Sequence, residues 1–233
     1  MLSFFNSLTR RREQFVPLEP GRVRMYLCGP TIYAPPHIGN LRTFFFADLL
    51  HRYLEFRGYE VRFVMNLTDV DDKTIAGATR EGVPLREYTE PYAMLLFESL
   101  EALGIQRADV YPRATEYIPQ MIDLIRRLEE RGLAYEADGS VYFDISEFPG
   151  YGKLSRVDIE QGRRGERVAA DEYDRGDVRD FALWKAAKPE DEKVGAVWQT
   201  PWGPGRPGWH IECSAMSMAE LGETFDIHGG GVD

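Results

Sequence analysis

The chain has 233 residues, 43% of them hydrophobic, and a formal net charge of -10 at pH 7. That length allows one substantial core, or one core with an insertion. The negative charge excludes a generally basic nucleic-acid-binding surface, although the arginines at 10–12 remain available for local phosphate contacts. Apolar runs of about 18 residues and a signal peptide are both missing from the sequence, so we expect a cytoplasmic protein with no membrane partner.

The first part of the chain alternates between strand and helix patterns. An apolar stretch from Arg24 to Cys28 stops at Gly29 and Pro30, which predicts a buried parallel strand. A helical pattern follows at 41–56, and a second strand is predicted at 59–65. This order predicts a right-handed βαβ unit, the opening of an α/β fold with a Rossmann-type parallel sheet. Its ligand site is expected at the carboxyl ends of the strands.

Later segments are less uniform. The patterns predict helices at 71–81, 85–103 and 115–131, a strand at 139–144, a Gly/Pro/Trp loop at 198–208, a helix at 211–221 and a strand at 224–228. The segment 150–179 is Gly-rich and heavily charged, which predicts an exposed and partly mobile insertion. Asp69, Asp71 and Asp72 stand at a helix start, where we interpret them as capping residues and dipole partners rather than as magnesium ligands.

A candidate anion site lies at the start of the first long helix. His37 and Asn40 are three residues apart there, so both side chains can reach the first turn, where free N–H groups and the helix dipole favour a triphosphate. The alternative is a capping loop with an incidental histidine. The neighbouring Cys28-Gly29-Pro30-Thr31, at the end of a predicted strand, favours the ligand site.

The two cysteines form a second candidate site. Cys28 and Cys213 are 185 positions apart, which argues against a disulfide framework, and both can be interpreted as buried apolar residues. Because Cys28 ends a strand and Cys213 opens a helix, both can also face one crevice, where two thiolates make half of a tetrahedral zinc site. His210 and His228 are near in sequence, whereas Glu212 is expected to point elsewhere on its helix.

Two further signals are weak alone. The segment 229–233, Gly-Gly-Gly-Val-Asp, is typical of a turn at a strand end, where a backbone approaches a ligand and an acid meets a ribose hydroxyl. Trp209 stands close to the second thiol, so it is the tryptophan that we associate with the site.

Together these motifs resemble the cysteinyl-tRNA synthetase family of class I aminoacyl-tRNA synthetases, in the family's order and over essentially the whole chain. The segments that carry the resemblance are 25–33 (MYLCGPTIY), 37–40 (HIGN), 66–73 (NLTDVDDK), 205–214 (GRPGWHIECS) and 225–231 (FDIHGGG). The resemblance implies a Rossmann-type catalytic domain whose first half spans 1–113, a connective insertion at 114–203 and the start of the second half at 204–233.

The resemblance also implies a reaction and roles for residues. L-cysteine and ATP, as its Mg²⁺ complex, would form cysteinyl-adenylate, and the cysteinyl group would pass to tRNA(Cys). Zinc would bind the substrate thiolate, so that serine is rejected by bond chemistry without editing. The residues implied are Cys28 and Cys213 as metal ligands, His37 and Asn40 as catalytic residues at the ATP phosphates, and Gly29, Pro30, Thr31, Thr43, Asn66, Thr68, Trp209, His228, Gly231 and Asp233 at the adenylate.

Some family features are missing from the sequence. Asn40 replaces the last histidine of the common signature, and the family's remaining zinc ligands, its lysine-rich loop and its anticodon-binding region lie beyond Asp233. We therefore expect an N-terminal piece that is monomeric and weakly active or inactive alone. The alternatives are the related cysteine ligase of mycothiol biosynthesis and, in another class, a non-catalytic module that binds a nucleotide or cysteine.

Overall fold

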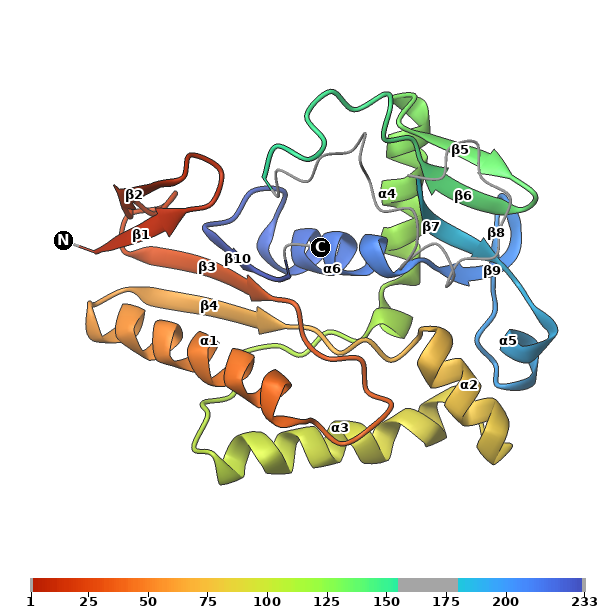
Figure 1. The fold of residues 1–233 in the computed structure, drawn as a ribbon, viewed down its shortest axis with the longest axis horizontal. Coiled ribbons are helices and arrows are strands. Elements are labelled where there is room, and N and C mark those ends of the chain that lie inside the picture. Colours follow the sequence, from red (N-terminus) through yellow and green to blue (C-terminus); the bar gives the residue numbers. More distant parts are fainter. Residues whose placement is uncertain (1, 155–179, 232–233) are drawn as a thin grey trace.

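A parallel sheet forms the centre of the molecule. The structure, a computed structural model, describes residues 2–154 and 180–231. The central sheet is 3-stranded with the order β10-β3-β4, formed by β3 (Arg22–Leu27), β4 (Glu60–Met65) and β10 (Ile227–Gly229). All neighbours are parallel, and α1 (Ile38–Phe56) connects β3 to β4 (Figure 1). The predicted βαβ unit and the Rossmann-type α/β fold class are confirmed.

Helices cover both faces of this sheet. Tyr26 of β3 belongs to one apolar cluster with Met216 of α6 (Trp209–Leu221), whereas its neighbour Met25 belongs to another with Phe44 of α1. Successive strand residues point to opposite faces, so the two clusters lie on opposite sides of the sheet. Figure 1 shows α6 and α1 on these two sides. The carboxyl ends of the strands are thus enclosed between two layers of helix.

Further helices pack around α1 and α6. They are α2 (Asp72–Glu81), α3 (Leu85–Ala102), the 3-10 turn η1 (Ala114–Glu116) and α4 (Ile118–Glu130). Of these, α3 contacts α1, whereas α4 contacts α6 on the other side of the sheet. Asp71 is the N-cap of α2, because its side chain accepts the backbone N–H groups of Lys73 and Thr74, both at 2.8 Å. The capping interpretation is therefore confirmed for Asp71.

A second sheet lies beside the first. It is 5-stranded and antiparallel with the order β5-β6-β7-β9-β8, formed by β5 (Ala134–Ala137), β6 (Ser140–Phe143), β7 (Phe181–Ala186), β8 (Trp198–Thr200) and β9 (Gly203–Pro207). The short helix α5 (Pro189–Lys193) connects β7 to β8. The prediction of a loop at 198–208 is wrong, because β8 and β9 pair there as antiparallel strands. Backbone hydrogen bonds hold this pair, so the sequence need not show the apolar alternation that would reveal it. Most of the charged segment 150–179 lies outside the described residues.

Ion pairs join α2 to the antiparallel sheet. The carboxylate of Asp72 contacts Nζ of Lys185 at 3.1 Å and also pairs with Arg206, which is 3% exposed. Arg206 in turn lies 3.2 Å from the carboxylate of Asp191 in α5. Asp72 thus acts through ion pairs with β7 and β9, beyond the dipole role that the sequence indicates.

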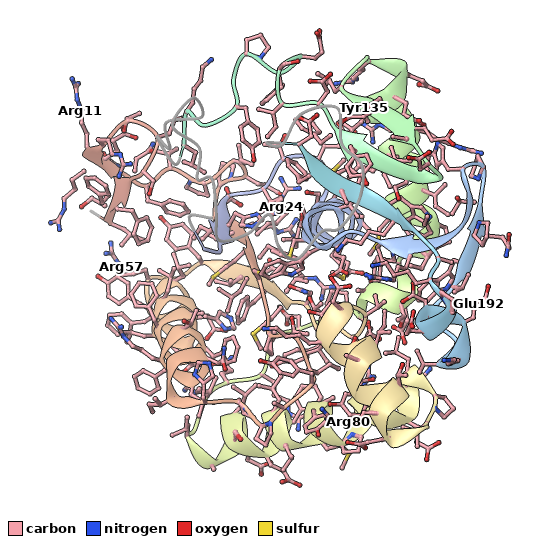
Figure 2. The ribbon with its side chains drawn as sticks, turned by 45° about the vertical axis from the view of Figure 1, so that its right-hand side comes forward. Arg11, Arg24, Arg57, Arg80, Tyr135 and Glu192 are labelled. Atoms are coloured by element: carbon pink, nitrogen blue, oxygen red, sulfur yellow. The ribbon has the colours of Figure 1, made fainter. Side chains whose placement is uncertain are left out.

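A hairpin of β1 (Ser3–Asn6) and β2 (Arg11–Gln14) stands at the start of the described chain. Arg24 of β3, labelled in Figure 2, donates from Nη1 to the Leu221 carbonyl oxygen at 2.8 Å and so fastens β3 to the end of α6. Within the residues 2–154 and 180–231, none of the helices combines the length and apolar character needed to cross a membrane.

Candidate active site

The two cysteine sulfurs meet at the carboxyl end of the central strand. Cys28 directly follows β3, and Cys213 lies in the second turn of α6. The Cys213 thiol donates to the Cys28 sulfur across 3.4 Å. Both residues are free cysteines of intermediate exposure. The structure therefore brings together two thiols that are 185 residues apart, as the zinc hypothesis requires.

The hydrogen bond between the sulfurs makes the two thiols unequal. It lowers the pKa of Cys28, although burial acts in the opposite direction. The pKa of Cys213 is raised, because its proton is held by Cys28 and its side chain is buried. Ionisation of the pair therefore begins at Cys28, and a metal ion that binds thiolates would displace the shared proton.

Asn66 connects the sulfurs to the two loops beside them. Its fully buried side chain accepts the Gly29 N–H at 2.9 Å and donates to Oγ1 of Thr68 at 3.2 Å. Oδ1 of Asn66, the oxygen that accepts the Gly29 N–H, lies 3.7 Å from the Cys213 sulfur. The backbone continues this link, since Thr68 N–H donates to the Pro30 carbonyl at 3.1 Å. Predicted site residues from three segments thus form one connected group.

His37 and Asn40 cap α1. Nδ1 of His37 accepts the Gly39 N–H at 3.0 Å, and Oδ1 of Asn40 accepts the His37 N–H at 3.2 Å. These reciprocal bonds are a capping box, so the capping alternative holds for both residues. A neutral imidazole that accepts at Nδ1 carries its proton on Nε2, which leaves Nε2–H as a donor for an anion. Capping and phosphate binding are compatible here.

The remaining predicted residues differ in position. Thr31 forms a parallel bridge with Thr68, and His228 pairs in register with Tyr26, so both lie at the strand ends. Thr43 is exposed and donates to the Gly39 carbonyl at 3.3 Å, within α1. Trp209 opens α6 and is 53% exposed. Gly231 is exposed, and Asp233 lies outside the described residues.

Metal ligands are incomplete in the described part of the chain. Two Zn–S bonds of about 2.3 Å at a tetrahedral angle separate their sulfurs by about 3.8 Å. The separation of 3.4 Å between Cys28 and Cys213 is close to that value, so the pair fits two positions of a zinc site. Within residues 2–154 and 180–231, no group of three or more His, Cys, Asp or Glu side chains is arranged to hold a metal ion.

The acidic residues near the site are held by protein groups. Asp69 accepts the backbone N–H of Thr115 at 2.9 Å and its hydroxyl at 2.6 Å. Burial raises the pKa of Asp69 despite these bonds. For Asp72, burial alone would raise the pKa, but Arg206 and Lys185 hold it below its usual value. These contacts agree with the structural interpretation of the acidic cluster.

Two residues near the sulfurs were not predicted as part of the site. Glu212 is fully buried, and its carboxyl acts electrostatically on Cys28, Cys213 and Tyr26. Burial, with Asp69 and Asp71 nearby, raises its pKa well above the usual value. Tyr26 is also fully buried beside Cys213. The strand period offered the missing signal for Tyr26, because residues 26 and 28 share a face.

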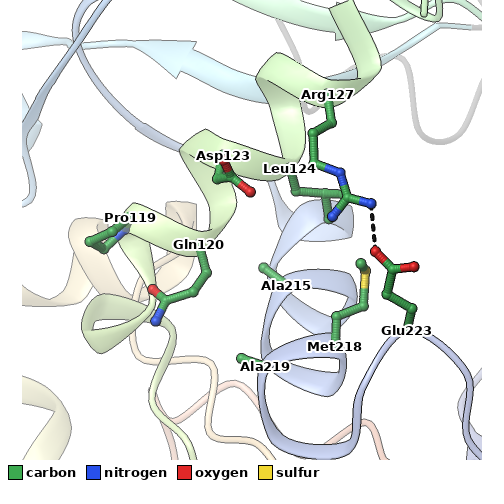
Figure 3. Close-up of a pocket in the computed structure, with 9 residues that line it drawn as sticks. All are labelled: Pro119, Gln120, Asp123, Leu124, Arg127, Ala215, Met218, Ala219 and Glu223. Carbon is green, nitrogen blue, oxygen red and sulfur yellow. Dashed lines mark hydrogen bonds and ion pairs between the residues drawn. The ribbon is translucent and has the colours of Figure 1, made fainter.

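A separate hollow lies away from these residues. It has a volume of about 450 Å³ and lies between α4 and α6, where Leu124 and Met218 line it (Figure 3). Arg127 and Glu223 form an ion pair of 2.6 Å across its rim. Of the predicted site residues that the structure describes, none lines the hollow. The chemistry-bearing side chains lie instead at the strand ends, as expected for an open α/β sheet.

The fold and the matched residues define a class of protein. A family model described as "tRNA synthetases class I (C) catalytic domain" matches residues 14–233, and the chain belongs to this family. Over 233 residues it is 54% identical to a cysteine–tRNA ligase of Chlamydia pneumoniae and 52% identical to one of Methanosarcina mazei. These alignments cover 100% of the chain and 49% of each relative, so the chain spans about half of their length.

Solved structures give a more distant likeness. A methionyl-tRNA synthetase of Mycobacterium tuberculosis bound by methionyl-adenylate is 22% identical, with a TM-score of 0.47 over 54% of this chain and 25% of that chain. The leucyl-tRNA synthetase ternary complex of Agrobacterium radiobacter K84 has a TM-score of 0.45 at 23% identity, over 57% of this chain and 18% of that chain.

Proposed function

We propose that the chain carries the cysteine-activating site of a cysteine–tRNA ligase. In this reaction the carboxylate of L-cysteine attacks the α-phosphorus of ATP, which releases pyrophosphate and forms cysteinyl-adenylate. The cysteinyl group then passes to the terminal ribose of tRNA(Cys). The observation that carries the proposal is the 3.4 Å separation of the Cys28 and Cys213 sulfurs at the strand ends. Relatives 50–54% identical, all named cysteine–tRNA ligases, support it.

The proposed metal is zinc, held by the thiolates of Cys28 and Cys213. When bound, it supplies a preference for a thiolate over a hydroxyl, which separates cysteine from serine. The chain's own residues orient this pair. Asn66 holds Gly29 and lies 3.7 Å from the Cys213 sulfur, and the buried packing around them excludes water from one side. Other ligands would come from outside the described residues.

The proposed ATP site lies at the first turn of α1. The imidazole Nε2–H of His37 and the side chain of Asn40 would donate to phosphate oxygens, next to the free N–H groups of the helix start. Gly29, Pro30, Thr31 and Thr68 would line the adenylate, with Thr43, Trp209, His228, Gly231 and Asp233 at its edges. We further propose a monomer that acts in the cytoplasm, with residues 114–203 as the connective insertion.

Metal analysis tests this proposal. The purified chain is expected to take up zinc, and Cys28→Ser and Cys213→Ser are each expected to lose most of it, because a hydroxyl is a poor zinc ligand. Ser214→Ala, at the exposed neighbour of Cys213, is the matched control and should keep the metal. Zinc content that is unchanged by both cysteine substitutions contradicts the site.

An exchange assay tests the reaction itself. Cysteine-dependent exchange between ATP and pyrophosphate, measured in a protein of the relatives' full length that contains this chain, should fall strongly in Cys28→Ser. Serine should not support the exchange. A binding module without catalysis would show no exchange with either amino acid.

A further inference from the structure

Tyr26 lies next to the thiol of Cys213. It is two residues before Cys28 on β3, so both side chains point to the face that α6 covers. Its ring is tilted against His228, at 5.3 Å between centroids, and against Phe225, at 6.4 Å. Tyr26 is 0% exposed. A tyrosine that is buried this completely usually directs its hydroxyl to a hydrogen-bond partner.

The hydroxyl of Tyr26 has only a marginal partner, the thiol of Cys213. Among the described residues, no group makes a hydrogen bond of good geometry with its Oη. The groups that act on it are the thiols of Cys213 and Cys28 and the carboxyl of Glu212. Cys213 already donates its own proton to Cys28, so its sulfur faces the hydroxyl as an acceptor. A protonated thiol is only a weak acceptor.

We propose that Tyr26 is a positioning residue of the metal site, whose hydroxyl donates to the Cys213 sulfur once that sulfur is a metal-bound thiolate. A thiolate is a far stronger acceptor than a thiol, so the marginal contact between the hydroxyl and the sulfur becomes a strong hydrogen bond when the metal binds. The bond holds the sulfur's orientation and offsets part of its negative charge, as outer hydrogen bonds do at other metal sites. This inference rests on the proposed zinc function.

The buried surroundings make this role specific to the hydroxyl. The phenylalanine ring would fill the same space against His228 and Phe225 without an unpaired polar atom. A buried hydroxyl without a partner lowers stability. Packing alone therefore favours phenylalanine at position 26, and the hydroxyl requires a different explanation.

Metal binding to Tyr26→Phe tests the proposal. Zinc affinity is measured by competition with a chromophoric chelator, and Co²⁺ is used as a probe for the thiolate-to-metal charge-transfer bands. We expect zinc affinity to fall by about 10- to 100-fold, the usual effect of losing an outer hydrogen bond. The charge-transfer bands should shift, and the melting temperature of the metal-free protein should not fall.

Tyr88→Phe is the matched control. Tyr88 is also buried, at 4% exposure, but its hydroxyl donates to the Tyr33 carbonyl oxygen at 3.0 Å, away from the sulfurs. This variant should have a lower melting temperature and unchanged zinc affinity. The two variants thus separate loss of a stabilising hydrogen bond from loss of a bond to the metal-bound sulfur.

Each contrary outcome has one meaning. If the parent protein binds zinc and Tyr26→Phe matches it in affinity and in the Co²⁺ spectrum, the role of Tyr26 is overturned while the thiol site stands. A metal-free Tyr26→Phe that melts at a lower temperature assigns the hydroxyl to packing and also overturns it. If the parent protein binds no zinc, the proposed function fails at its metal site.

Discussion

A side-chain hydrogen bond, from the Gly29 N–H to Oδ1 of Asn66 at 2.9 Å, joins the loop after β3 to the loop after β4, beside the backbone bond from Thr68 to Pro30. Asn66 is 0% exposed, so water cannot replace it. The sequence places these residues in two separate motifs, yet the parallel pairing of β3 and β4 brings both loops to one edge. The buried amide of Asn66 therefore helps to hold the two loops of the site together.

Asn66→Ala should lower the free energy of unfolding by about 1–3 kcal/mol, because the Gly29 N–H is left without its partner in a buried place. Urea unfolding of the metal-free protein measures this loss. The variant should also bind zinc more weakly, since the loop that carries Cys28 is released on one side. An unchanged unfolding midpoint would show that the amide is not holding the loop.

Gly29→Ala should be more damaging than its small size suggests. A Cβ at position 29 would lie 1.7 Å from the Asn66 carbonyl oxygen, and this backbone cannot move without separating β3 from β4. We expect a loss of about 3 kcal/mol or more, or failure to fold. Gly230→Ala is the control from the same site, because its added Cβ meets nothing nearer than 3.6 Å. Equal melting temperatures for the two variants would contradict the argument.

Asp72→Asn should destabilise the protein mainly at neutral pH. Burial alone would raise the pKa of Asp72, but Arg206 and Lys185 hold it below the usual value, so its ion pairs stabilise the fold above the unfolded pKa of about 3.9. That stability is lost as the pH falls through the lower pKa of the folded state. Because the Asp72 side chain is 55% exposed, we expect a cost of only about 1 kcal/mol at pH 7.

Thermal melting at several pH values checks this. The difference between Asp72→Asn and the parent protein should shrink towards acid pH. Asp123→Asn, at an exposed position on α4, is the control, and its melting temperature should equal that of the parent at every pH. A constant difference across the acid range would mean that the ion pairs are not the cause.

Glu212→Gln should change stability in the opposite pH direction. Burial, with Asp69 and Asp71 nearby, raises the pKa of Glu212 well above its usual value, so the folded state retains a proton that the unfolded chain releases. Stability of the parent protein therefore falls as the pH rises from the unfolded pKa of about 4.3. Glutamine removes this titration. The free energy of unfolding of the variant should therefore rise relative to that of the parent between about pH 5 and about pH 8.

Urea unfolding at both ends of this pH range measures the change in the free energy of unfolding. Glu98→Gln, at an exposed position on α3, is the control, and its stability relative to the parent should not change with pH. A Glu212→Gln variant that loses stability equally at both pH values would mean that the carboxyl is needed as an ion.

The long, strongly patterned elements were predictable, and the short ones were not. Helix α1, strand β4 and helix α3 have enough turns or apolar alternation to be found in the sequence. Strand β2 reads Arg-Arg-Glu-Gln and β9 reads Gly-Pro-Gly-Arg-Pro, so neither carries a strand pattern. Their pairing comes from backbone hydrogen bonds to neighbours that only the assembled sheet provides.

By itself, the sequence determined which residues carry chemistry, because a cysteine at a strand end and a histidine at a helix start are local features. Only the tertiary structure decided that Cys28 and Cys213 come within 3.4 Å, and that Asn66 and Tyr26 lie next to the Cys213 sulfur. The reason is physical: these contacts span up to 187 residues and depend on how α6 packs over β3, which no local pattern encodes.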